Sequence, residues 1–196
     1  MRTKLMRLII FLMLLGFGSL SHAISLNYSI IGTGSGSLGG VSFSNTAFSI
    51  DLIGDTDLFN GVSIDPLSSA TVSISGFDTT TLNIATRLGS TPSVAFFSRA
   101  SSAGSLDLFD FNLSGPVDLT QAFGPVVGTG VFALNQFSNV ASSLGLLTFL
   151  SSSDVSFQAV NVSTVPVPAA AWLFGSAVLG FFGMRRKSAK ITALTA

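Results

Sequence analysis

The sequence predicts a mainly β protein whose central domain is an antiparallel β-sandwich or jelly-roll. Between residues 24 and 164 the chain has 27 Ser, 13 Thr and 15 Gly, which is 55 of 141 residues, and it lacks the strong helix formers Glu, Lys and Met. Apolar and polar residues alternate there, which is the pattern of strands with one buried face. Turn residues divide this pattern into about nine to eleven short strands, which suit two layers better than one flat sheet.

The alternation identifies the strands in order along the chain. Each run keeps one face apolar while polar residues take the other: Val41 and Phe43; Phe48, Ile50 and Leu52; Val72 and Ile74; Leu82 and Ile84; Val155, Phe157 and Ala159. Turns are expected at Gly39-Gly40, Asn60-Gly61, Asp65-Pro66, Gly76, Gly89, Gly115-Pro116 and Gly124-Pro125, and loops at the Ser-rich segments 101–104 and 151–153. The recurrence of Phe, Val, Ile and Leu at strand spacing disfavours the alternative of a disordered Ser/Thr-rich chain.

One segment changes the parity of its alternation. Leu106 and Leu108 share one parity, whereas Phe109, Phe111 and Leu113 share the other. A β-bulge near Leu108 and Phe109 explains the change, and so does a strand that is buried on both faces.

The N-terminal residues 1–23 predict a secretory signal peptide. Three basic residues lie within the first seven positions, an apolar run covers 8–15, and the small residues Ser21 and Ala23 occupy the positions that a signal peptidase inspects. We expect export through the secretory translocon and cleavage after Ala23. The alternative of an uncleaved anchor is weaker, because the apolar run is short for a bilayer span of about 20 residues.

The C-terminal region predicts a transmembrane helix. Residues 165–184 form an uncharged stretch of 20 residues, which as a helix reaches about 30 Å. The basic cluster Arg185, Arg186 and Lys187 follows directly and marks the cytoplasmic side. This topology places the domain 24–160 outside the cytoplasm, joined by the linker 161–164, and leaves 188–196 as a cytoplasmic tail.

A short proline-containing motif precedes that apolar stretch. It reads Val165, Pro166, Val167, Pro168 and Ala169, and its two prolines deny helix and hold the segment extended. Motif, apolar helix and basic cluster in this order resemble the PEP-CTERM class of bacterial protein-sorting signals, most closely its VPLPA-CTERM variant.

The resemblance covers residues 165–187. Val165, Pro166, Pro168 and Ala169 match the motif, and Val167 stands where the variant has Leu. The resemblance implies a Gram-negative bacterium, export, recognition of the tail by a membrane-embedded exosortase, and association with extracellular polysaccharide. The nine residues 188–196 continue beyond the usual ending of such tails. An ordinary single-pass anchor is the alternative, because anchors share the order of apolar span and basic flank.

Charge and composition exclude several classes of function. The formal net charge is zero, but residues 24–164 hold two arginines and all nine aspartates, a net charge of −7. That stretch has no cationic face for a nucleic acid. The chain has no Cys, and its one His, His22, lies in the predicted signal peptide. A catalytic triad therefore cannot be assembled in the domain. We expect that the protein is not an enzyme and that it binds no cofactor.

The densest cluster of oxygen ligands comprises Asp55, Asp57, Asn60 and Asp65, which is a weak candidate for a Ca²⁺ site. The EF-hand pattern is not met, because Phe59 replaces a ligand and the terminal Glu is absent. A solvated turn between two strands is the simpler interpretation.

Asp107 and Asp110 are a second candidate pair, because glycoside hydrolysis uses two carboxyl groups. The alternative interpretation places both on solvent-facing strand positions. Arg87 and Arg99 are expected to be salt-bridge partners of the surrounding acids.

These observations lead to three hypotheses about function. The first is a noncatalytic exported protein of the cell surface or extracellular matrix, sorted by an exosortase and associated with exopolysaccharide or biofilm. The second is a carbohydrate-binding β-sandwich module, with or without Ca²⁺, which needs exposed Phe because Tyr28 is the only Tyr or Trp of the domain. The third is an Asp-dependent glycoside hydrolase.

Overall fold

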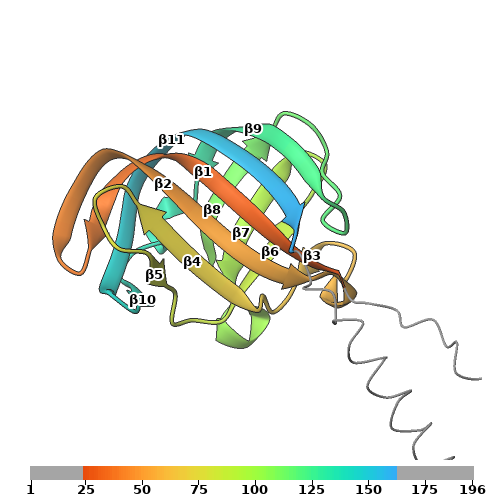
Figure 1. Ribbon diagram of the computed structural model, residues 1–196, viewed down its shortest axis with the longest axis horizontal. Helices are drawn as coiled ribbons and strands as arrows, with labels where there is room; N and C mark the ends of the chain where they lie inside the picture. The colour runs from red at the N-terminus through yellow and green to blue at the C-terminus, as the bar shows by residue number, and fades with distance from the viewer. Residues whose placement is uncertain (1–23, 163–196) are drawn as a thin grey trace, which may run out of the picture. The chain divides into compact units, whose positions relative to one another are not determined.

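The computed structural model describes residues 24–162, which form mainly antiparallel β-structure (Figure 1). The strands are β1 (Ser25–Leu38), β2 (Val41–Asp55), β3 (Ser63–Ile64), β4 (Ser69–Ile74), β5 (Thr80–Thr81), β6 (Thr86–Ser90), β7 (Val94–Arg99), β8 (Asp107–Leu113), β9 (Phe123–Phe132), β10 (Val140–Ser142) and β11 (Gly145–Asn161). Three 3-10 turns join them: η1 (Thr56–Leu58), η2 (Ser101–Ala103) and η3 (Leu134–Gln136). No helix within 24–162 has the length and apolar character to span a membrane. The predicted signal peptide, sorting motif, transmembrane helix and cytoplasmic tail lie outside the described residues.

All strands belong to one 11-stranded sheet with the order β3-β6-β7-β8-β9-β11-β1-β2-β4-β5, and β10 pairs with β11. The sheet curls, so that β1, β2, β4 and β11 lie in front of β6, β7 and β8 (Figure 1). The prediction of a mainly β, antiparallel domain is confirmed. The two expected layers are halves of a single curled sheet instead of two separate sheets, because β9 pairs with both β8 and β11 and continues the ladder between them.

The core between the two halves is built from phenyl rings. Phe48 of β2 meets Phe149 of β11 and Phe109 of β8, with ring centroids 4.9 and 5.7 Å apart. Phe109 and Phe149 complete the group at 6.1 Å, and all three contacts are edge-to-face. This geometry is favourable for aromatic pairs beyond the area that they bury.

Glycines of β1 make room for these rings. Gly32, Gly34 and Gly36 face the core, where a side chain would meet the rings of neighbouring strands. A Cβ at Gly34 would lie 3.2 Å from ring carbons of both Phe48 and Phe149. The strand therefore stays paired along its length while the rings lie directly against its backbone.

The strands differ in length from the short ones that were predicted. β1, β2 and β11 have 14, 15 and 17 residues, because register shifts let them bend without ending. The run of Leu82 and Ile84 is not a strand. Leu82 makes one isolated bridge, to Ser142, and the strand there is limited to β5.

Three turn or loop predictions are wrong for related reasons. Gly89 lies inside β6, where it pairs with Phe96. Gly124-Pro125 lies inside β9, at a register shift against β11, and a bulge tolerates proline within a sheet. Residues 151–153 belong to β11, where the hydroxyl of Ser153 lies 2.9 Å from that of Thr33 on β1. In each case a neighbouring strand supplies the partners that the local sequence does not reveal.

The parity change in β8 has both of its predicted causes. Ser98 pairs with Asp107 and Phe97 with Phe109, so that Leu108 is an extra residue in β8. Leu108, Phe109 and Asp110 are all buried, so the strand is also covered on both faces.

The two ends of the described chain meet at one corner of the sheet. Leu26 of β1 pairs with Asn161, which is the last residue of β11. The amide of Val162 donates to the carbonyl of Ser25 at 3.0 Å. The first half of the predicted linker 161–164 is thus hydrogen-bonded to the start of the domain.

The role of the β1 glycines predicts the effect of substituting them. A Cβ at Gly36 would lie 2.0 Å from the carbonyl oxygen of Thr148, a backbone atom that cannot move aside. Gly36→Ala should lower the free energy of unfolding by about 1–3 kcal/mol, measured by urea denaturation. Gly124→Ala is the matched control, since nothing lies within 4 Å of its Cβ position. Equal stability of the two variants would contradict this packing.

Candidate functional site

Two of the predicted calcium ligands in the loop after β2, Asp55 and Asn60, accept local hydrogen bonds through their side chains. Oδ1 of Asp55 accepts from the amide of Asp57 at 2.9 Å and caps η1. Oδ1 of Asn60 accepts from the amides of Val62 and Ser63 at 3.1 and 2.9 Å. These bonds shape the turn between β2 and β3, which is the structural role expected for Asp and Asn in turns.

Asp65, the fourth predicted ligand, turns to a different loop. Its Oδ2 accepts from the amide and the hydroxyl of Ser101, at 3.1 and 2.5 Å, and so fastens η2 to the β3–β4 connection. Within residues 24–162 no three acidic or His side chains come close enough to share a metal ion. The structure does not bring the four candidates together as a ligand set.

A polar surface covers the outer side of β4, β2, β1 and β11, and we call it the hydroxyl face. Asp51 lies at its centre. Ser29 and Ser49 donate to the two oxygens of its carboxylate at 2.6 and 2.9 Å, and Thr71 donates to its backbone carbonyl at 3.4 Å. Gln158 extends the same row on β11, opposite Ser29. The row therefore presents hydroxyl, carboxylate and amide groups across four neighbouring strands.

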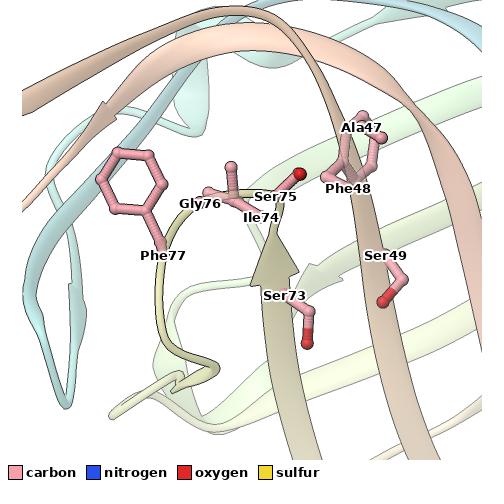
Figure 2. A pocket seen from close by; sticks show the side chains of 8 residues that line it. All are labelled: Ala47, Phe48, Ser49, Ser73, Ile74, Ser75, Gly76 and Phe77. Atoms are coloured by element: carbon pink, nitrogen blue, oxygen red, sulfur yellow. The ribbon is translucent and has the colours of Figure 1, made fainter.

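An open hollow of about 320 Å³ borders the hydroxyl face where β4 ends. Ser49 and Ser73 form one side of it, as a directly paired couple on β2 and β4. Figure 2 shows the two hydroxyls pointing the same way, with the Phe77 ring at the far side of the hollow. Phe77 packs edge-to-face on Phe43 at 6.0 Å, which holds that side in place.

A different surface lies on the outer side of β6, β7, β8 and β9. Two cross-strand rows form it. One row is Arg87, Ser98 and Asp107, and the other is Gly89, Phe96, Asp110 and Phe132. We call Arg87, Phe96, Ser98, Asp107, Asp110 and Phe132 the charged-aromatic patch.

The bulge in β8 creates the acidic pair of this patch. Residues three apart on a regular strand point to opposite faces. The extra residue Leu108 shifts the alternation by one, so that Asp107 and Asp110 both face outward. Asp107 accepts a hydrogen bond from the buried hydroxyl of Ser98 at 2.9 Å.

Asp110 is unusual among the carboxylates because it is only 5% exposed. Its flanking cross-strand neighbours are the rings of Phe96 and Phe132. Burial, together with the negative charge of Asp107, raises the pKa of Asp110 to about 7, and the positive charge of Arg87 opposes the increase. Its Oδ1 has no hydrogen-bond partner within the part of the chain that the structure describes.

Phe96 and Arg87 occupy the space next to this carboxylate. The Phe96 ring leans across Gly89, whose missing side chain would lie 2.0 Å from the ring Cζ. The Arg87 guanidinium carbon lies 5.5 Å from the centroid of the same ring, within range of a cation–π interaction. The Nε of Arg87 is buried, and no described residue forms a hydrogen bond with it.

The comparisons with known proteins add no family to this description. No protein-family model matches the chain, and neither a curated protein nor a solved structure matches it.

The sequence located part of this patch and missed the rest. It singled out Asp107 and Asp110 but placed both on solvent-facing positions, and that interpretation is wrong for Asp110 because two neighbouring rings cover it. Phe96 and Phe132 were missed as functional candidates. The alternation of the strand could have placed Phe96 on the outer face. Its neighbours Ala95 and Phe97 are both buried in the core, so the residue between them points the other way.

The raised pKa of Asp110 predicts how stability depends on pH. The folded state binds the proton more tightly than the unfolded chain, whose pKa is near 3.8, so wild-type stability falls as pH rises from about 4 to about 7 and then levels. Asp110→Asn should remove this decline and be more stable at pH 8 by up to about 4 kcal/mol. Urea denaturation of both proteins at pH 5 and pH 8 measures the free energies of unfolding. A decline of equal size in wild type and variant would contradict the assignment.

The engaged ligands of the β2–β3 loop predict a weak response to calcium. Millimolar Ca²⁺ should shift the melting temperature of the purified chain by no more than Mg²⁺ does, because the oxygens of Asp55 and Asn60 already accept backbone hydrogen bonds. Differential scanning calorimetry with each cation measures the shift. A Ca²⁺-specific increase that disappears in Asp57→Asn would show that a site forms there.

Proposed function

We propose that this chain is an exported, noncatalytic protein of the cell surface or extracellular matrix, sorted by an exosortase and associated with exopolysaccharide. The observation that carries the proposal is the order of sequence features in the tail, where the motif at 165–169 precedes an uncharged stretch and the basic cluster 185–187. In this proposal a signal peptidase removes 1–23 after translocation. Residues 165–187, which contain the predicted transmembrane helix after the motif, then hold the domain at the outer side of the inner membrane until the exosortase processes the motif.

Two features of the domain support processing at both ends. The first and last strands, β1 and β11, pair with each other, and the last described amide is bonded to Ser25. All eleven strands that the structure describes lie between residues 25 and 161, so removal of 1–23 and of the tail from 165 onward takes none of them. The hydroxyl face supplies the hydrogen-bonding surface that a polyhydroxylated matrix polymer requires.

Deletion of residues 165–196 in the host bacterium tests the proposal. We expect the truncated protein to lose surface display and retention in the biofilm, because the exosortase no longer has its signal. Deletion of 188–196 alone is the matched control, since it keeps the motif, the apolar stretch and the basic cluster. Mass spectrometry of the mature wild-type protein should show a C-terminus near Pro168. Unchanged display and retention after the longer deletion would refute the proposal.

A carbohydrate-binding module is the second candidate. The observation that favours it is the pair of rings on the outer face, where Phe132 is 43% exposed and Phe96 is half-buried. These rings supply the exposed Phe that this hypothesis needs in a domain with a single, buried Tyr. Both candidates place the domain in contact with polysaccharide, and they differ in whether one defined site holds a sugar.

A further inference from the structure

The charged-aromatic patch combines aromatic rings with unpaired hydrogen-bonding groups, and this combination identifies a ligand class. We infer that the patch is a saccharide-binding site that takes an uncharged sugar ring. The inference rests on the proposed association with polysaccharide and deepens it, because it assigns both the site and the type of sugar.

The two rings provide an apolar platform on either side of a carboxylate. Phe96 is on β7 and Phe132 on β9, each directly opposite Asp110 of β8, so the two ring-bearing strands lie about 10 Å apart. The C–H groups on one face of a pyranose are apolar and pack against aromatic rings. The ring of Phe96 leans across Gly89, and the Arg87 guanidinium carbon lies 5.5 Å from the centroid of this ring.

The polar groups of the patch lack the partners that hydroxyls would supply. Asp110 Oδ1 is a buried acceptor and Arg87 Nε a buried donor, and neither has a hydrogen-bond partner among residues 24–162. An unpaired buried polar group destabilises the free protein, and a ligand that supplies the missing partner removes this cost. A sugar hydroxyl both donates and accepts, so it can pair with either kind of group. Asp107 has one oxygen bonded to Ser98, which keeps that carboxylate oriented.

The charges of the patch select against charged ligands. Asp107 and Asp110 repel a carboxylate, sulfate or phosphate group, and the Arg87 guanidinium repels a divalent cation. Because Asp110 is about half-ionised near neutral pH, the charges of Arg87, Asp107 and Asp110 sum to between zero and −1. A neutral hexose is therefore favoured over a uronic acid.

The site should respond to pH through Asp110. The charged groups that face it are Asp107 on its own strand and Arg87 from β6, whereas β7 contributes Phe96 and β9 contributes Phe132. An ionised carboxylate accepts stronger hydrogen bonds from hydroxyls than a neutral one. Affinity for the sugar is accordingly expected to increase as pH rises through about 7.

The test uses the full chain in detergent micelles and immobilised dextran, mannan and galactan, with polygalacturonate as the acidic comparison. We expect binding to at least one neutral polymer and weaker binding to polygalacturonate. Phe132→Ser should lower the affinity about tenfold or more, as is typical for an anchoring aromatic residue. Val127→Ser is the matched control, because Val127 is 60% exposed on the same strand outside the patch.

Two further variants make the outcome decisive. Arg87→Gln should also weaken binding. It provides the test if the melting transition of Phe132→Ser shows that this variant does not fold. Asp110→Asn should abolish the increase in affinity between pH 5.5 and pH 8.5. Lack of binding to every neutral polymer overturns the inference, as does unchanged affinity of folded Phe132→Ser and Arg87→Gln. The proposed function has a separate test. It fails if the variant that lacks residues 165–196 is still displayed on the surface and retained in the biofilm.

Discussion

The curled sheet depends on the close packing of phenyl rings against the glycines of β1. Gly34 faces the core beneath Phe48 and Phe149, with no side chain to hold the rings away from the backbone. The same rings contact Phe109 of the opposite half, so one cluster both bends the front strands and joins the two halves. Interiors pack at the density of organic crystals, and a single added methyl group at these glycines would therefore force strands apart.

The curl gives the domain two outer surfaces with different chemistry. The front half presents hydroxyls arranged around Asp51, whose carboxylate accepts from Ser29 and Ser49 within the surface. The other half presents two rings beside a buried carboxylate with an unpaired oxygen. On the first surface the Asp51 carboxylate already accepts from Ser29 and Ser49, whereas the buried Oδ1 of Asn27 on β1 is unpaired in the described residues. The second surface differs because its unpaired buried groups lie beside two aromatic rings, and this combination distinguishes it as the candidate site.

A single extra residue connects the fold to the candidate site. The bulge at Leu108 turns Asp107 and Asp110 to the same face, where alternation alone would separate them. The parity change made the bulge predictable, and the acid pair was visible in the sequence. That the bulge brings the two acids to one face could be seen only from the register against β7. The pairs Phe97–Phe109 and Ser98–Asp107 show that Leu108 is the extra residue. The covering rings of Phe96 and Phe132 come from strands 14 residues before and 22 residues after Asp110, so no local pattern could place them there.

The sequence by itself determined the strand class of the domain, the acidic charge of its central part, the absence of thiol and histidine chemistry there, and the order of the tail that underlies the sorting proposal. These properties follow from composition and local periodicity, which each residue expresses without reference to distant partners. The tertiary structure decided that the layers are one curled sheet, that the Asp and Asn of the β2–β3 loop are engaged in local hydrogen bonds, and that Asp110 is buried between two rings. Burial and register depend on contacts between strands far apart in the chain, and those contacts exist only once the sheet has formed.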